Sequence, residues 1–356
     1  MARYAFKPDY TIAPGATLRE TIEQQGMSQA ELAQRTGLAQ KTVSQIINGI
    51  APISFETSEK LEMATGVPSS FWNRRELSHR EALAKREELV RFESEVNWLK
   101  QVPVKELVNR GVVEPTEDKP ELVRRMLKFF GVSSVSSWRE TWLMPAAQYR
   151  GGKSQEKHPG YVAAWLRLGE LQAGSIACEP FDRDAFRRCL SDIRSLTQLP
   201  VTDWQSRLSK TCAKAGVVVA ITREVPRAAL SGAARWLTKE RALIQLSLKY
   251  KTDDQFWFTF FHEAGHILLH GKRQVFLEYG NRSDTEIERE ANAFARDWLI
   301  PPDFVRDLPY LKSKASIKTF AKEIGISPGV VVGRLQYDKV LPPSHCNDLK
   351  LKCEWK

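Results

Sequence analysis

The spacing of apolar and polar positions divides the chain into regions of different character. Residues 17–70 form short helical segments separated by glycines, and residues 73–100 place apolar side chains at loose helical spacing among many charges. The second pattern is typical of linking helices with solvated faces. From 121 to about 212 the pattern is mostly helical. Two short β-branched runs follow at 215–222 and 241–250, and their length and composition predict strands.

Helical spacing returns after these strands. A third strand candidate covers 228–237, where Gly232 indicates a turn or bulge, and helices are expected at 254–271 and 284–299. Two prolines then end the second helix. With 113–120 as the best linker candidate, the sequence predicts four parts: a helical domain at 10–75, a helical linker at 76–120, an α+β domain at 121–305 and a helical subdomain at 306–356.

Residues 27–54 carry the signals of two short helices joined by a tight turn. Ser28 and Glu31 form the S-x-x-E pattern that begins a helix, and Gly37 ends that helix. This spacing is typical of a helix-turn-helix, although a helical hairpin with a solvated polar face would show the same pattern. The outward face of the second helix carries groups that can read base edges and hold phosphates: Gln40, Lys41, Ser44, Gln45 and Asn48.

Residues 256–271 read FWFTFFHEAGHILLHG and hold three of the six histidines in the chain. On a helix His262 and His266 share one face because they are four residues apart, so both imidazoles can reach one metal ion. Glu263 follows the first of them and can take a proton from metal-bound water. Core histidines satisfied by carboxylates are the alternative, but three clustered rings make it costly because each buried ring needs partners.

A catalytic zinc ion needs a third protein ligand and an open coordination position. The helix expected at 284–299 offers Glu288 and Glu290. On a helical wheel Glu288 lies about 60° from the centre of the apolar stripe and Glu290 about 100° away, so Glu288 is the predicted ligand. Asn292 shares its face and is expected to accept a hydrogen bond from a ligand histidine. His270 is expected either in such an outer position or as a helix-end residue favoured by the dipole.

Composition and charge change this picture little. The chain has 356 residues and a net charge of +10, which suits a polyanionic partner without proving one. Its five cysteines are odd in number and none lies in a CxxC pair, which fits reduced intracellular thiols better than a disulfide framework or a Cys-zinc cluster. No uncharged apolar run approaches the roughly 20 residues of a membrane span, and we find no signal peptide. We therefore expect a soluble cytoplasmic protein without a membrane partner.

The stretch SQAELAQRTGLAQKTVSQIINGIAPIS resembles the phage-repressor (XRE) type of helix-turn-helix, in particular its HigA-like antitoxin branch. The resemblance implies a five-helix domain, often dimeric, whose second motif helix enters the major groove of operator DNA. Gln40, Lys41 and Gln45 fall where that family reads bases, and Gln29 falls where it holds a phosphate. Double-stranded operator DNA and a second copy of the chain are therefore the expected partners of this domain.

The stretch FWFTFFHEAGHILLHG, followed by EREANAFARDWLIPP, resembles the ImmA/IrrE family of intracellular metallopeptidases. The resemblance spans most of residues 120–305. It implies an α+β glutamate-zincin fold with a short twisted sheet beside the H-E-x-x-H helix, Zn²⁺ as cofactor, and endoproteolysis of a DNA-bound repressor or similar regulator. The residues that match the family's motifs are His262 and His266 at its metal histidines, Glu263 at its catalytic glutamate, and Glu288, Ala291 and Asn292 in its E-x-x-A-N pattern.

Two functions are consistent with the sequence. In the first, the chain binds operator DNA and is a zinc-dependent endopeptidase that cleaves a protein regulator or operon partner. In the second, it is an antitoxin-like repressor whose metal domain only binds a partner or senses a signal. Glu263 favours the first function, because a binding module does not need a general base beside its metal ligands.

The last 50 residues also have helix-turn-helix-like spacing, in IKTFAKEIGISPGVVVGRLQYDKVL. We interpret them as the small helical subdomain that the peptidase resemblance implies at this end of the chain. A second DNA-binding unit is the alternative interpretation.

Overall fold

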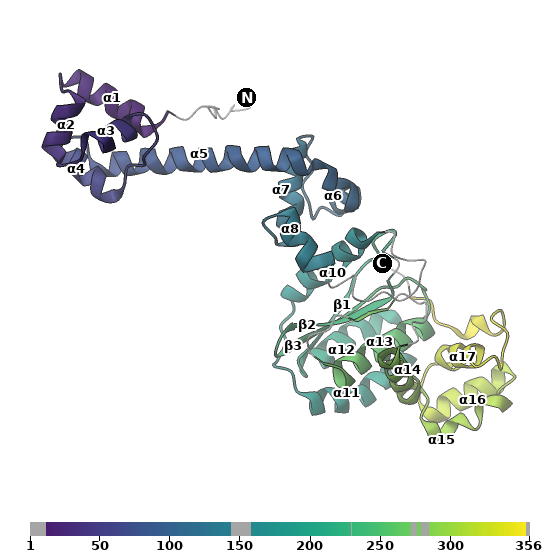
Figure 1. Ribbon diagram of the computed structural model, residues 1–356. Helices are drawn as coiled ribbons and strands as arrows, with labels where there is room; N and C mark the ends of the chain where they lie inside the picture. The colour runs from purple at the N-terminus through teal and green to yellow at the C-terminus, as the bar shows by residue number, and fades with distance from the viewer. Residues whose placement is uncertain (1–11, 144–157, 229, 272–275, 279–284, 354–356) are drawn as a thin grey trace, which may run out of the picture. The chain divides into compact units, whose positions relative to one another are not determined.

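The computed structural model describes residues 12–143, 158–228, 230–271, 276–278 and 285–353. Its contacts divide the chain into two compact units (Figure 1). The N-terminal unit extends to Ser94, and the C-terminal unit comprises Glu95–Asp118 and Leu122–Lys356, while Lys119–Glu121 group with the N-terminal unit. None of the described helices combines the length and apolar composition that a bilayer crossing requires.

The described part of the N-terminal unit consists of α-helices. The start and the end of α2 follow the sequence pattern: the Ser28 hydroxyl accepts a hydrogen bond from the Glu31 amide at 3.1 Å, and Gly37, in the turn to α3, has a positive φ of 68°. The Glu31 carboxylate accepts a bond from Arg35, one turn later, at 2.5 Å. The helices are α1 (Pro14–Gln24), α2 (Gln29–Thr36), α3 (Gln40–Ile47), α4 (Phe55–Thr65) and α5 (Ser69–Glu95).

A compact apolar core fixes the position of α3 in this unit. Leu18, Val43 and Trp72 are among its buried side chains. Helix α1 crosses α3 at Gly15, where an added Cβ would lie 1.9 Å from the Ile46 carbonyl oxygen. Only glycine fits this contact, so the close crossing holds the apolar face of α3 inward and leaves its polar face outward.

The C-terminal unit contains a mixed four-stranded sheet in the order β1-β3-β2-β4. Strand β1 is parallel to β3, and the other two pairs are antiparallel. The three strands expected from the sequence are present, and β4 adds a short fourth strand that the sequence pattern did not indicate. The strands are β1 (Val217–Ile221), β2 (Gly232–Thr238), β3 (Arg241–Leu246) and β4 (Phe276–Glu278).

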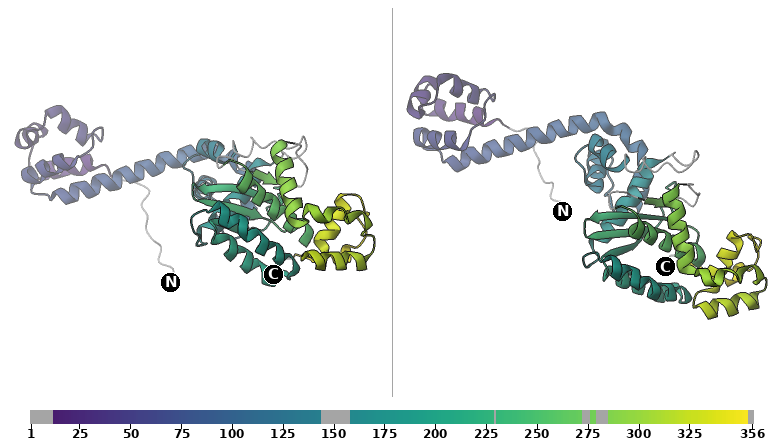
Figure 2. Two further views of the ribbon diagram at one scale, coloured as in Figure 1. Left: turned by 90° about the horizontal axis from the view of Figure 1, so that it is seen from below. Right: turned by 60° about the horizontal axis from the view of Figure 1, so that its bottom comes forward.

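Helices cover both faces of this sheet (Figure 1, Figure 2). Val217 and Val219 of β1 belong to the large core that includes residues of α11, α12 and α13, whereas Val218 and Ala220 pack with Ala173 of α10. A strand buried on both faces needs apolar side chains at every position, which explains the unbroken apolar run VVVAI in β1. The covering helices are α10 (Pro159–Gly174), α11 (Arg183–Ser195), α12 (Val201–Ala213), α13 (Asp253–Leu269) and α14 (Glu286–Leu299).

The second part of the linker expected at 76–120 contributes to a small aromatic cluster at the start of the C-terminal unit. Trp98 packs edge-to-face on Phe130 and Trp138, with ring centroids 6.2 and 5.2 Å away. Arg110 donates hydrogen bonds to the carbonyl oxygens of Arg223 and Glu224. Residues 95–118 are therefore part of this unit. Its elements before α10 are η1 (Val96–Gln101), α6 (Val104–Asn109), α7 (Lys119–Phe130), α8 (Val135–Trp138) and η2 (Arg139–Leu143).

The helix pair α16–α17 near the C-terminus has the geometry of a helix-turn-helix, with Gly325 in its turn at φ 71°. However, α17 packs on the beginning of α13. A Cβ added to Gly333 would lie 2.5 Å from Asp254 Oδ2, and one added to Gly329 would lie 2.4 Å from Asp253 Oδ1. This face of α17 is thus not available to a DNA groove. The remaining elements are η3 (Leu196–Gln198), α15 (Pro302–Val305), η4 (Leu308–Tyr310), α16 (Lys314–Ile324), α17 (Pro328–Tyr337) and η5 (Asn347–Leu349).

Candidate functional site

Helix α13 carries the H-E-x-x-H pattern through the centre of the C-terminal unit. Asp253 and Asp254 lie in its first turn, where the helix dipole favours negative charge. Its apolar side chains are buried on nearly all sides. At Gly265 an added Cβ would lie only 3.3 Å from the Cα of Ala291. The small residue therefore lets α14 approach α13 closely enough for the side chains of both helices to meet.

Three potential metal-ligating side chains meet between these two helices. The Nε2 atoms of His262 and His266 lie 3.0 Å apart. Glu288 places Oε2 3.1 Å from Nε2 of His262 and Oε1 3.5 Å from Nε2 of His266. A tetrahedral zinc ion with ligands at about 2.05 Å would separate those ligand atoms by about 3.3 Å. The spacing and the two-imidazole, one-carboxylate donor set therefore both fit such an ion.

The electrostatic surroundings keep the imidazole of His266 ready to bind a cation. Both histidines are 1% exposed. Burial, followed by the nearby rings of His262 and His270, lowers the pKa of His266 to about 2. The ring of His266 is therefore neutral at physiological pH and offers a nitrogen lone pair.

The position of Glu288 follows from the local structure of α14. Thr285 caps this helix by accepting a hydrogen bond from the Glu288 amide at 3.3 Å. The buried stripe of α14 contains Ala291, Ala295 and Leu299. At its edge the Glu288 side chain is 15% exposed, whereas that of Glu290 is 53% exposed. As the helical wheel predicted, Glu288 rather than Glu290 reaches the two histidines.

An outer chain of contacts connects the cluster to the surface. Nδ1 of His266 lies 3.0 Å from Nδ1 of His270, and Nε2 of His270 lies 3.0 Å from Oε2 of Glu290. His270 thus lies in the outer position beside His266, and it also lies at the helix end, because it directly follows the last residue of α13. The expectation for Asn292 is not met at His266, whose outer nitrogen faces His270. Asn292 instead lines a cavity beside Glu288, one turn further along α14.

Glu263 lies directly beneath strand β2. Its side chain is fully buried, and a Cβ added to Gly232 would lie 2.6 Å from Glu263 Oε1 and 2.5 Å from Cγ2 of Thr259. Gly232 is the first residue of β2 and is not among the positive-φ glycines. The sequence indicated a turn or bulge at Gly232, but space for the Glu263 carboxylate is what requires glycine there. A glycine inside a strand was the available signal, because it can also mark a close approach.

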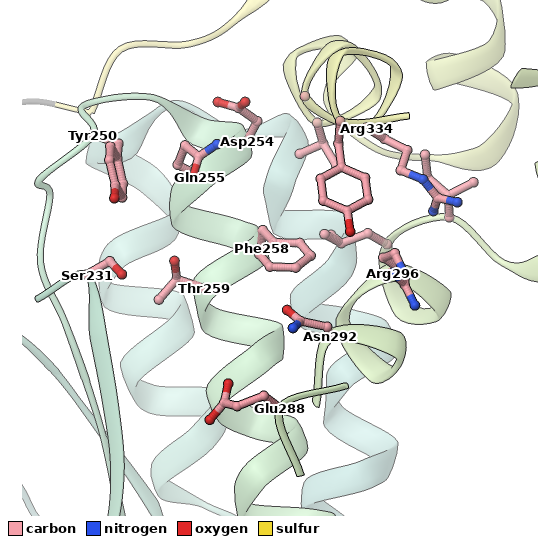
Figure 3. A pocket seen from close by; sticks show the side chains of 15 residues that line it. Ser231, Tyr250, Asp254, Gln255, Phe258, Thr259, Glu288, Asn292, Arg296 and Arg334 are labelled. Carbon is pink, nitrogen blue, oxygen red and sulfur yellow. The ribbon is translucent and has the colours of Figure 1, made fainter. Parts of the chain in front are cut away.

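A cavity of about 250 Å³ begins at Glu288 and Asn292 and extends toward α17 (Figure 3). Phe258, one turn before His262, contributes an aromatic surface to it. The sequence analysis did not identify several of its residues, because they come from separate elements that only the tertiary fold brings together. These residues include Ser231, Tyr250, Arg296, Arg334 and Tyr337.

The polar face of α3 is the candidate nucleic-acid surface of the N-terminal unit. Gln40, Lys41 and Asn48 are exposed, Ser44 and Gln45 are half-buried, and Gln29 is exposed at the start of α2. Arg19 of α1 donates a hydrogen bond to Oδ1 of Asn48 at 3.1 Å, and Asn48 Nδ2 donates to the Ser44 hydroxyl at 3.4 Å. Arg19 adds a cation to this face that the motif could not indicate, because α1 precedes it.

Comparisons with known proteins identify two regions of the chain. Residues 18–72 match a family model described as helix-turn-helix. Residues 216–336 match a peptidase-family model described as IrrE N-terminal-like domain, a later and narrower region than the 120–305 of the sequence resemblance. None of the curated proteins matches the chain.

Among the solved structures, the chain is similar to an addiction module antidote protein of a HigA family from Coxiella burnetii. The two are 26% identical over 24% of this chain and 94% of that one, with a TM-score of 0.22. Residues 18–72 are therefore similar to helix-turn-helix domains, and residues 216–336 are similar to a peptidase-family domain whose region holds the whole His262, His266 and Glu288 cluster.

Proposed function

We propose that this protein is a cytoplasmic transcription regulator in which the peptidase-family domain is a zinc-dependent endopeptidase that cleaves a protein regulator or operon partner. The observation that carries the proposal is the convergence of His262, His266 and Glu288, together with the fully buried side chain of Glu263, which follows His262 on the same helix. A site that only held a metal for binding or sensing would have no use for that carboxylate.

The residues of the cluster have distinct roles in this proposal. His262, His266 and Glu288 hold Zn²⁺, which when bound supplies Lewis-acid polarisation of a carbonyl and lowers the pKa of water. Glu263 accepts the proton of the attacking water and donates it to the departing amine. His270 fixes the orientation of the His266 ring through their 3.0 Å contact.

The N-terminal domain supplies the DNA-binding half of the proposed function. Helix α3 enters the major groove of operator DNA, where Lys41 and Gln45 contact bases and Gln29 holds a phosphate. The match of residues 18–72 to a helix-turn-helix model and the basic charge of the chain support a polyanionic partner, and the domain is also proposed to form a homodimer.

Replacement of Glu263 by Gln tests the peptidase proposal. The amide keeps the shape of the side chain but cannot accept the proton, so cleavage of the physiological partner should be abolished while zinc content is retained. Purified protein is incubated with the products of neighbouring genes, and fragments are identified by mass spectrometry. Glu286→Gln, on an exposed residue of α14, is the matched control.

Each outcome separates the two hypotheses. Fragments that appear with the wild type and the control but not with Glu263→Gln support the endopeptidase. Cleavage by Glu263→Gln at the wild-type rate contradicts it. A zinc-loaded wild type that binds such a partner without cutting it supports the antitoxin-like repressor whose metal domain only binds or senses.

A further inference from the structure

The cavity beside the metal cluster continues along one face of α14 to a basic end. Glu288, Asn292 and Arg296 line it at intervals of four residues, which places them on the same side of the helix. Figure 3 shows them in this order along α14. Since an α-helix rises about 1.5 Å per residue, Arg296 lies about 12 Å along the axis from Glu288.

The far end of the cavity has excess positive charge. Arg296 is half-buried in the wall and makes no ion pair with any residue in the described part of the chain. Arg334 of α17 lines the same region, and its Nε lies 2.6 Å from Oδ2 of Asp338. Asp254, the other acidic residue of the lining besides Glu288, is neutralised by Lys350 at 2.7 Å. A half-buried guanidinium without an acidic partner is suited to an incoming carboxylate.

Apolar side chains also line the cavity, namely those of Phe258, Leu299, Ile300 and Val330. An extended peptide rises about 3.3 Å per residue, so the roughly 12 Å from Glu288 to Arg296 correspond to three or four residues. Because the acidic side chain and the arginine side chain each span part of this distance, the acidic residue can lie between two and four residues from the cleaved bond.

We propose that this cavity is a substrate-binding cleft that selects an aspartate or glutamate two to four residues from the cleaved bond, with Arg296 as the main contact to its carboxylate. The inference rests on the proposed peptidase function and names its substrate class. Arg334 adds to the positive potential, while its bond to Asp338 keeps it in position.

Cleavage of blocked peptides tests this selectivity. The zinc-loaded full-length protein is given decapeptides with acetylated and amidated ends, so that terminal carboxylates cannot contribute, and each peptide carries one Glu or Gln at a defined position. We expect one position, two to four residues from the cut, at which Glu raises kcat/KM over Gln by roughly tenfold to a hundredfold. Equal cleavage of the Glu and Gln series overturns the inference.

Substitution of Arg296 connects the preference to the structure. Arg296→Gln should lower the Glu-to-Gln ratio of kcat/KM at least about tenfold, and Arg296→Lys should retain part of it because the charge remains. Arg306→Gln, at a side chain that is 86% exposed, is the control and should leave the ratio unchanged. If Arg296→Gln weakens cleavage of both peptides equally, the arginine is only structural and the inference is wrong.

A binding measurement keeps this inference separate from the peptidase proposal. Zinc-loaded Glu263→Gln protein is titrated with fluorescein-labelled Glu and Gln peptides, and fluorescence anisotropy gives both dissociation constants. Tighter binding of the Glu peptide, lost in the double variant with Arg296→Gln, supports the cleft even if no peptide is ever cut. Glu263-dependent cleavage without any acidic preference in rate or binding leaves the peptidase intact and overturns the cleft.

Discussion

Removal of the Glu288 carboxylate is predicted to weaken zinc binding by roughly a hundredfold to a thousandfold. Glu288 places both oxygens within 3.1–3.5 Å of the ligand nitrogens, so alanine would leave the ion with two protein ligands. Structural zinc sites with four ligands bind with about 10–16 kcal/mol, or about 2.5–4 kcal/mol per ligand. A factor of ten corresponds to about 1.4 kcal/mol, which gives the predicted range.

Smaller effects are expected further from the ion. His270 contacts His266 directly, and loss of such an outer partner typically costs tenfold to a hundredfold in metal affinity. Glu290 acts on the cluster only through His270, and its side chain is 53% exposed, so Glu290→Ala should cost about tenfold or less. The predicted order of the losses is therefore Glu288→Ala, then His270→Ala, then Glu290→Ala.

Competition with a chromophoric zinc chelator at neutral pH measures these losses on metal-free protein. Glu286→Ala serves as the control, since this residue is an exposed acid of the same helical turn. Circular dichroism confirms that each variant is folded. A loss for Glu290→Ala that equals or exceeds the loss for Glu288→Ala would refute the ligand assignment.

Two further predictions concern other parts of the chain. Burial raises the pKa of Asp253 from 3.8 to about 6, with the nearby Asp254 charge adding to the shift, so the folded protein binds a proton that the unfolded chain releases. This carboxyl should contribute about 3 kcal/mol less to stability at pH 6 than at pH 4, with no further loss above, so the stability difference between wild type and Asp253→Asn in calorimetry should change by that amount over this interval; a constant difference contradicts the assignment. Lys41→Ala with Gln45→Ala should weaken specific operator binding by about 1–3 kcal/mol for each lost base contact, without changing zinc content; unchanged operator affinity in a gel-shift assay excludes α3 as the reading helix.

Local spacing along single helices was sufficient to predict that His262, His266 and Glu288 lie close together. The four-residue interval between His262 and His266 fixes their common face whatever the rest of the fold does. The choice of Glu288 also depended only on the apolar stripe of its own helix, which is buried as the wheel indicated. Similarly, the turn at Gly37 follows from a backbone conformation that glycine adopts readily.

Features that depend on contacts between distant segments could not be predicted in this way. The role of Gly232 requires that β2 pass over Glu263, and the cavity requires that Tyr250, Arg296 and Arg334 meet from three elements. The boundary near residue 95 was missed because helical spacing continues across it. The packing of Trp98 on residues of α7 and α8 and the hydrogen bonds of Arg110 to the backbone of Arg223 and Glu224 assign that segment to the C-terminal unit.

The glycines of α17 have a consequence for reading other sequences of this kind. Counted from the turn glycine, the fourth and eighth residues are Lys41 and Gln45 after Gly37, but Gly329 and Gly333 after Gly325. After Gly37 these two positions carry long polar side chains that are available to a groove of DNA. After Gly325 they carry only backbone, which lets α13 pack closely on α17. The same turn thus leads into two kinds of helix, and the bulk of two side chains distinguishes an exposed polar face from a face that packs inside the protein.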